Sequence, residues 1–419
     1  MGAEADEESL DTLSPLITTT PGSKAPGLRV NEVSTNSPPS AQSTRRWFSS
    51  VFSTPPKDVS ADASGATLKE VIEKLRGAGD LSVSDEVLAT CGKRLLDLVP
   101  SLDKVAKATK VGAHEALLVA LHERGVHSVT VAHALLPPLV NISAGDDEAG
   151  LKRASVLVQL GTLETLTAVL NAHGLTGDNS TDASDPVLDT VFRCIWVMQH
   201  LCRRTNAASS PWLAKLTSGG ILDAVIKIAA RFPSRRKLLT RVCFFLADIC
   251  YALSNGSSGV SAGMASGVHL SPHDSRMTVL PTILQVLQMP LDVGENPRPA
   301  VGCEVHEAAC LALGDVCVGP VLLKSALDAG AAFLIVNAMQ RFPSAVELQA
   351  VGCRAFRVMW LAAGKNEELK TAIAEQDVTE TMLRALDHPY VQERVGTGRE
   401  AEYRQVVEQI VTFRSTNGL

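Results

Sequence analysis

Apolar side chains recur at steps of three and four residues along almost the whole chain from Thr67 onward. This spacing places them on one face of an α-helix. It is clearest in the segments TLKEVIEKL, HEALLVAL, LETLTAVL, ILDAVIKIA, LPTILQVL and AFLIVNAM. No stretch shows the alternation of apolar and polar residues that is typical of a half-buried strand. The pattern therefore predicts an all-α domain over residues 66–419.

Several of these predicted helices directly follow a glycine, at Gly112, Gly161, Gly220 and Gly330. The first three glycines recur at intervals of about 45 to 60 residues, within or just above the period of paired-helix and triple-helix repeats, and Gly330 follows Gly220 after about two such intervals. Polar insertions near residues 180 and 265 account for the longer intervals, and we expect them to be surface loops. The spacing thus favours a repeat array of helical units.

One internal duplication supports this interpretation. RFPSRRKLLTRVCFFLADIC begins at Arg231 and RFPSAVELQAVGCRAFRVMW begins at Arg341, and the match continues to the cysteines Cys243 and Cys353. We expect the shared Arg-Phe-Pro-Ser to end one helix and to begin the next, because proline fits the first turn of a helix but not its interior.

The segment VHEAACLALGDVC (Val305 to Cys317) resembles the long third helix of the armadillo repeat family, and LQAVGCRAFRVMW (Leu348 to Trp360) resembles a second copy. The resemblance extends over roughly residues 67 to 415, although HEAT repeats share the same period. It implies a right-handed α-solenoid of about six armadillo-type repeats. It also implies a non-catalytic protein that binds an extended segment of a partner on its concave face.

The cysteines allow two interpretations. Cys303, His306, Cys310 and Cys317 share one helical stripe, which would suit either a metal site or a packing seam. When the long helices are aligned, the same position is occupied by Cys194, Cys243, Cys310 and Cys353, whereas the histidine does not recur. A metal needs ligands that converge at one point, while recurrence in every repeat is typical of a core position. We therefore expect buried thiols, and we expect His306 to be a surface or boundary residue.

The same alignment predicts a row of polar side chains at the position where the family usually has asparagine. Five successive long helices carry Asp97, Asn141, Gln199, Asp248 and Asp315 there, and the sixth has Val358. In the family this residue hydrogen-bonds the main chain of an extended partner. The family's tryptophan positions hold Pro137, Ile195, Phe244, Leu311 and Arg354, so the slots for lysine side chains are missing. Three aspartates predict a preference for a basic segment, although these polar residues would also suit a row that only faces solvent.

Residues 1–65 have a different composition, rich in Ser, Thr and Pro, and predict a disordered N-terminal tail. The net charge of −6 and the pI of about 6.0 argue against a nucleic-acid partner. The acidic start MGAEADEESLD lacks the features of a secretory signal. The thiols are then expected to be reduced, in a cytoplasmic or nuclear protein.

Candidate chemistry is sparse, and we expect neither an enzyme nor a cofactor. GVSAG (Gly259 to Gly263) matches a nucleophile elbow, but it lies in a Gly/Ser-rich stretch without the strand that this motif needs. His269 and His273 lie in the same stretch. Gly2 leaves open one alternative, an N-myristoylated, membrane-tethered adaptor, although Asp6 stands where the motif has Ser or Thr. The sequence thus favours a scaffold or adaptor for protein partners, with membrane contact only if Gly2 is acylated.

Overall fold

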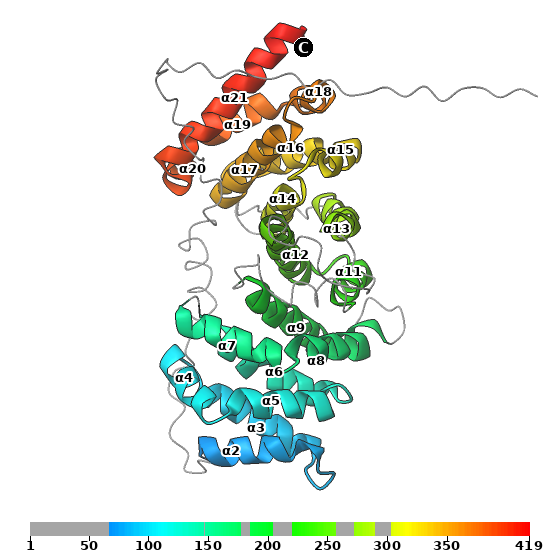
Figure 1. The fold of residues 1–419 in the computed structure, drawn as a ribbon, viewed down its shortest axis with the longest axis vertical. Coiled ribbons are helices and arrows are strands. Elements are labelled where there is room, and N and C mark those ends of the chain that lie inside the picture. Colours follow the sequence, from blue (N-terminus) through cyan, green and yellow to red (C-terminus); the bar gives the residue numbers. More distant parts are fainter. Residues whose placement is uncertain (1–66, 146, 177–184, 204–219, 257–271, 290–302) are drawn as a thin grey trace, which may run out of the picture. The chain divides into compact units, whose positions relative to one another are not determined.

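The computed structural model describes residues 67–145, 147–176, 185–203, 220–256, 272–289 and 303–419. The chain divides after Gly65 into two units, and all described residues belong to the second, Ala66–Leu419. The predicted tail, Gly2 and the GVSAG segment therefore lie outside the described residues. Every described element is a helix, and no strand occurs in the ranges given above, so the predicted all-α class is confirmed for this part of the chain (Figure 1).

Six long helices, which we call the long row, pack against one another in chain order. They are α3 (Asp85–Leu98), α6 (Val129–Ser143), α9 (Asp185–Arg203), α12 (Arg236–Gly256), α14 (Glu304–Val316) and α17 (Val346–Ala363). Each contacts its predecessor and its successor, and α17 then contacts α20 and α21.

A second row of helices runs beside the long row, again with neighbours in chain order. It consists of α2 (Leu68–Arg76), α5 (Ala113–Ala120), α8 (Thr162–Val169), α11 (Ile221–Arg231), α13 (Pro272–Leu287), α16 (Ala331–Arg341) and α19 (Val378–Leu386). Two of these, α5 and α8, continue into short π-helical turns at Leu121–Gly125 and Leu170–Leu175. The other helices are α4 (Leu102–Lys110), α7 (Glu148–Gln159), α15 (Pro320–Asp328), α18 (Glu367–Ala374), α20 (Pro389–Val395) and α21 (Thr397–Asn417), with a 3₁₀ turn at Gly77–Gly79.

The predicted glycine starts of the second-row helices are confirmed. Gly112, Gly161, Gly220 and Gly330 each occupy the N-cap position, with φ between 70° and 84°. A side chain would strain this left-handed backbone, so glycine is the residue that lets the chain turn sharply into the next helix.

The prediction for Arg-Phe-Pro-Ser was right about the helix ends and wrong about the proline. Helix α11 ends at Arg231 and α16 ends at Arg341, but the next helices begin only at Arg236 and Val346. Each proline therefore lies in the turn. Proline ends the preceding helix instead, because it has no N–H to donate to the carbonyl four residues earlier.

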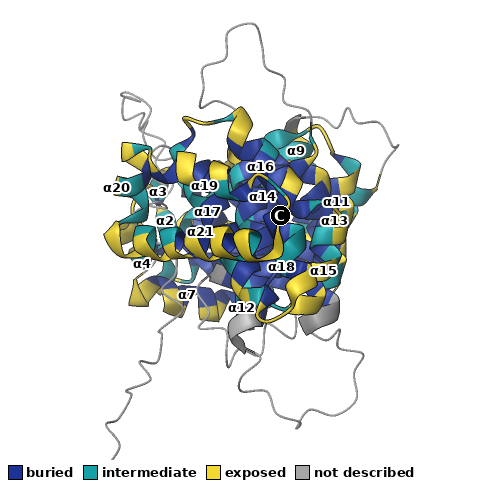
Figure 2. Ribbon diagram, turned by 90° about the horizontal axis from the view of Figure 1, so that it is seen from above, coloured by how far each residue is buried: buried dark blue, intermediate teal, exposed yellow. Residues whose placement is uncertain are grey.

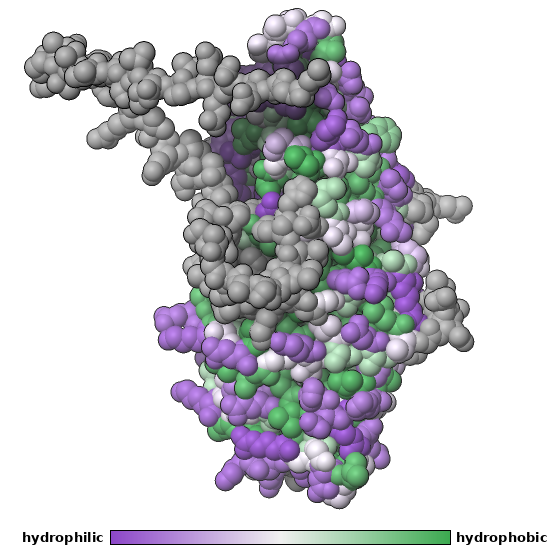
Figure 3. Space-filling view, turned by 45° about the vertical axis from the view of Figure 1, so that its right-hand side comes forward, coloured by the Kyte–Doolittle hydropathy of each residue, from purple (hydrophilic) through white to green (hydrophobic). Residues whose placement is uncertain are grey.

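The core consists of aliphatic, cysteine and a few aromatic side chains buried between the two rows (Figure 2). On the surface, hydrophobic and hydrophilic side chains lie side by side over the face drawn in Figure 3. The final helix, α21, buries Val406 and Ile410, and its Phe413 ring packs edge-on against Trp360 with 5.8 Å between ring centroids.

At Gly92 in α3, the backbone approaches α6 with no side chain in between. A Cβ atom there would lie 2.5 Å from the carbonyl oxygen of Ala134 in α6. Gly92→Ala should therefore push α3 and α6 apart and lower the free energy of unfolding by about 1–3 kcal/mol, measured by urea denaturation. Gly79→Ala is the matched control, because no heavy atom lies within 4 Å of its added Cβ. Equal stability of the two variants would contradict the helix contact.

Candidate functional site

The structure places each of the five predicted binding residues on a different helix of the long row. Asp97, Asn141, Gln199, Asp248 and Asp315 belong to α3, α6, α9, α12 and α14. Their exposure differs widely. The Asp97 side chain is 68% exposed, Asn141 and Asp248 are half-buried, and Gln199 and Asp315 are buried. The five positions therefore do not share one environment.

Two of these residues contact each other directly. The Gln199 amide Nε2 donates a hydrogen bond to Asp248 Oδ2 at 3.0 Å, which links α9 to α12. Arg241 of α12 donates to the other end of the same amide, at Gln199 Oε1. Its guanidinium also lies 4.5 Å from the ring centroid of Trp196. Gln199 is thus fixed at both ends by side chains of the next long helix.

Asn141 makes a different kind of link between long helices. Its Nδ2 donates to the carbonyl oxygen of Val99 at 3.2 Å. Val99 is the C-cap residue of α3, so this amide satisfies a backbone acceptor that the end of a helix would otherwise leave open. The predicted asparagine-type contact to a main chain is therefore present, but its acceptor belongs to the protein itself.

Asp315 forms a buried ion pair with the next long helix. Its carboxylate accepts a charge-assisted hydrogen bond from the Arg354 guanidinium of α17. Burial raises the pKa of Asp315 above its usual value, while the charge of Arg354 opposes that rise.

Reasoning from the sequence missed Arg241. The signal that could have found it is its position seven residues before Asp248, two helical turns along the same face of α12. With Arg241 and Arg354 included, the long row carries cations as well as the predicted acids. Asp97 is the only one of the five predicted residues whose side chain is mainly exposed.

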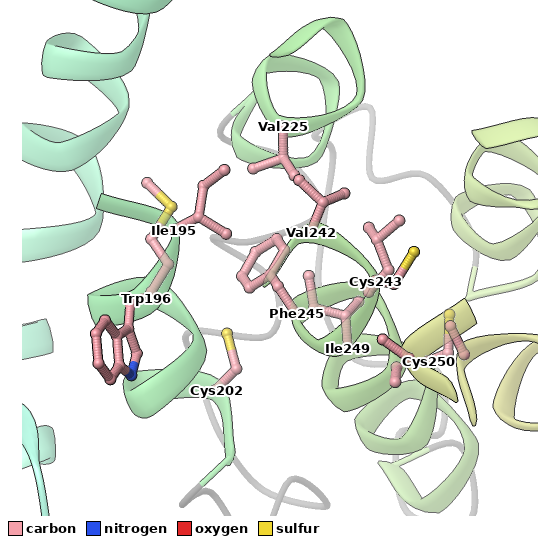
Figure 4. Close-up of a cluster of buried hydrophobic side chains, with 14 of the residues drawn as sticks. Ile195, Trp196, Cys202, Val225, Val242, Cys243, Phe245, Ile249 and Cys250 are labelled. Atoms are coloured by element: carbon pink, nitrogen blue, oxygen red, sulfur yellow. The ribbon is translucent and has the colours of Figure 1, made fainter. Parts of the chain in front are cut away.

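The predicted burial of the cysteines is confirmed, since all nine are buried and none forms a disulfide. Cys194, Cys243, Cys310 and Cys353 are fully enclosed, and burial raises the thiol pKa of Cys243 and of Cys353 to about 12. Figure 4 shows Cys202, Cys243 and Cys250 among aliphatic and aromatic side chains. In the ranges that the structure describes, no three His, Cys, Asp or Glu side chains come together as a metal site.

The prediction that His306 lies at the surface or boundary was wrong. It is 2% exposed, and its ring lies 6.0 Å from that of Phe342. Helix α14 contacts α12, α13 and α17, so it has little outward face on which a histidine could reach water. Burial, with Arg341 and Arg236 nearby, lowers the pKa of His306 to about 4, which keeps the ring neutral.

The neighbouring Glu307 gives a pH-dependent prediction. Burial first, and then Glu347 and Glu304, raise its pKa from 4.5 to about 7. A raised carboxyl pKa favours the protonated form in the folded state, so stability is lost as the pH rises from about 4.5 to above 7. Glu307→Gln should therefore be more stable than the wild type by up to about 3 kcal/mol at pH 8, with no gain at pH 4.

Urea denaturation across this pH range measures the difference. The control is Glu408→Gln, on the exposed face of α21, which should match the wild type at every pH. A Glu307→Gln gain that does not change with pH would contradict the assignment.

No family model matches the chain, and no curated protein matches it. No single helix of the described ranges has the length and apolar composition of a membrane span. One bent pair, Pro320–Asp328 with Ala331–Arg341 at 66°, meets that criterion on length and composition alone. Its second helix, α16, buries most of its apolar side chains inside the protein.

Proposed function

We propose that residues 66–419 form a right-handed α-solenoid of about six armadillo-type repeats. The proposal is supported by two rows of helices that pack in chain order and by left-handed glycines at the starts of four second-row helices, α5, α8, α11 and α16. The fully enclosed cysteines at equivalent positions of α9, α12, α14 and α17 support it too. In such an array each unit buries its apolar face against its neighbours.

The function would be that of a non-catalytic scaffold or adaptor that binds an extended segment of a partner protein along the long row. The observation that carries this proposal is the presence of polar side chains on five successive long helices. An extended peptide presents unpaired N–H and C=O groups at regular intervals, and side chains repeated from helix to helix can satisfy them.

Such a segment would make contact near the α3 end of the long row. Gln199, Asp248, Asn141 and Asp315 already form hydrogen bonds within the protein. Asp97 is exposed, and its ion pair with Arg94 is long, at 4.0 Å. We propose a basic segment there, since Asp97 remains accessible, whereas Arg354 compensates the buried Asp315.

Peptide selection against the full chain, followed by affinity measurement, tests the proposal. The selected peptides should be extended and rich in Lys or Arg. Asp97→Arg should weaken their binding by about tenfold or more. The matched control is Asp223→Arg, which reverses an exposed acid on α11 of the second row and should leave the affinity unchanged. Selected peptides that bind both variants and the wild type equally would contradict a site on the long row.

A further inference from the structure

A groove lies on the outer side of α2, the first described helix. It has a volume of about 470 Å³ and is lined by Thr67, Leu68, Lys69, Ile72, Glu73, Arg76 and Val111. The α2 residues in this set recur at one-turn spacing, so they form one face of the helix. The buried side of α2 packs on α3 and α5.

The floor of the groove is apolar, and the acids at its rim already interact with other groups of α2. The half-buried Leu68 and Val111, which is 49% exposed, supply the apolar surface, whereas Ile72 is itself buried. The Glu73 carboxylate pairs with Arg76 at 2.7 Å, and Glu70, the other acid of α2, caps the helix by accepting from the Thr67 N–H at 2.6 Å. The remaining charge at the rim is the ammonium group of Lys69.

Helix α4 extends this cationic surface. Lys104, Lys107 and Lys110 are all exposed. Lys104, Lys107 and Val111 stand at positions i, i+3 and i+7, so they lie on one face of the helix. The two lysines therefore lead along α4 to the edge of the groove. The distance covered is about 10 Å at the rise of an α-helix.

Among the exposed lysines of the described residues, some pair with an acid and others, such as Lys93 and Lys237, do not. Lys152, Lys227 and Lys324 each pair with an acid of their own or a neighbouring helix, at 2.7–2.9 Å. By contrast, the structure of the described residues contains no ion pair to Lys69, Lys104, Lys107 or Lys110. Unpaired cations beside an apolar groove are complementary to a ligand that carries both acids and an apolar side chain.

We propose that this groove binds an acidic amphipathic segment of a partner protein. An apolar side chain of the segment would cover Leu68 and Val111, and its carboxylates would approach Lys69, Lys104 and Lys107. The concave floor suits a single inserted side chain better than a lipid surface. The groove also lacks the aromatic side chains on which nucleic-acid bases stack. This site is separate from the long row, so its test does not depend on the proposed function.

Fluorescence anisotropy with labelled synthetic peptides tests the proposal on the full-length chain. The probes are peptides of repeated Glu-Glu-Leu, Lys-Lys-Leu and Glu-Glu-Ser units. The Glu-Glu-Leu peptide should bind, and the Glu-Glu-Ser peptide should bind more weakly because it has no apolar side chain for the floor. Any binding of the Lys-Lys-Leu peptide belongs to the long row, so changes to the lysines of this groove should not weaken it. The double variant Lys104→Glu/Lys107→Glu should lose about tenfold or more in affinity for the Glu-Glu-Leu peptide.

Two further variants keep the result interpretable. Val111→Ser alters only the floor. It should weaken the binding of the Glu-Glu-Leu peptide without affecting the binding of the Glu-Glu-Ser peptide. Lys152→Glu/Lys227→Glu makes the same charge change elsewhere and should have no effect. An equal loss in this control, or no binding of the Glu-Glu-Leu peptide, would overturn the proposal.

Two other occupants give distinct results. If no peptide binds, but the protein sediments with phosphatidylserine vesicles and Lys104→Glu/Lys107→Glu abolishes this sedimentation, the surface would be assigned to a membrane. If no peptide binds, but the chain self-associates with rising concentration and the same variant abolishes this, the surface would be assigned to a second copy of the chain. Either result would overturn the proposed partner.

Discussion

Replacing Asp315 by alanine is expected to lower the free energy of unfolding by about 3–5 kcal/mol. The carboxylate is buried between α14 and α17 and neutralises the largely buried guanidinium of Arg354. Its removal leaves that cation without its partner in an environment that solvates it poorly. The cost should therefore exceed that of losing one ordinary hydrogen bond, which is about 1 kcal/mol. Urea denaturation followed by circular dichroism measures the difference.

A double variant separates the effect of losing the ion pair from the effect of leaving one charge unpaired. Asp315→Leu/Arg354→Met removes both charges and leaves apolar side chains of similar size, so it should be less destabilised than either single change. The exposed pair Lys324–Glu368 provides the control, and Glu368→Ala should change stability far less than Asp315→Ala, because water screens an exposed ion pair. If Asp315→Ala were as mild as Glu368→Ala, the buried ion pair would be contradicted.

Phe245→Ala should cost about 3–5 kcal/mol, because it removes a fully buried ring from the centre of the long row. The ring lies in the cluster of Figure 4 with Val225, Val242 and Ile249. These neighbours come from α11 and α12, and neither helix can close the resulting cavity without losing its contacts with the next helix. The measurement is again the free energy of unfolding in urea.

The matched control is Phe333→Ala in α16, whose side chain is 58% exposed. The same chemical change at this surface position should alter stability by less than about 0.5 kcal/mol. Equal losses at Phe245 and Phe333 would contradict the burial pattern between the two rows.

The helical class and many helix starts could be predicted because they depend on local chemistry. Apolar spacing identifies the buried face of a helix, and a glycine before it supplies the left-handed residue that begins the second-row helices. The burial of the recurring cysteines was predictable for a similar reason. A residue type that recurs at the same position of successive long helices is typical of a buried core position.

The side-chain partners of the polar row could not be predicted in the same way. Gln199 and Asp248 are 49 residues apart, and Asp315 and Arg354 are 39 apart, so their pairing depends on how helices dock. His306 shows the same limit. Its helix has the composition of an ordinary amphipathic segment, and only the packing of three neighbours around α14 buries the imidazole.

Residue-resolved alkylation of the native protein tests most directly whether the recurring cysteine position of α9, α12, α14 and α17 is a core position in all four helices. Cys194, Cys243, Cys310 and Cys353 are fully buried, and thiols must ionise and reach solvent to react. The account predicts that all four stay unmodified in the native protein and become reactive only when the protein unfolds in denaturant. If any one of them reacted in the native protein as fast as a free cysteine, the equivalence of the long helices would be contradicted.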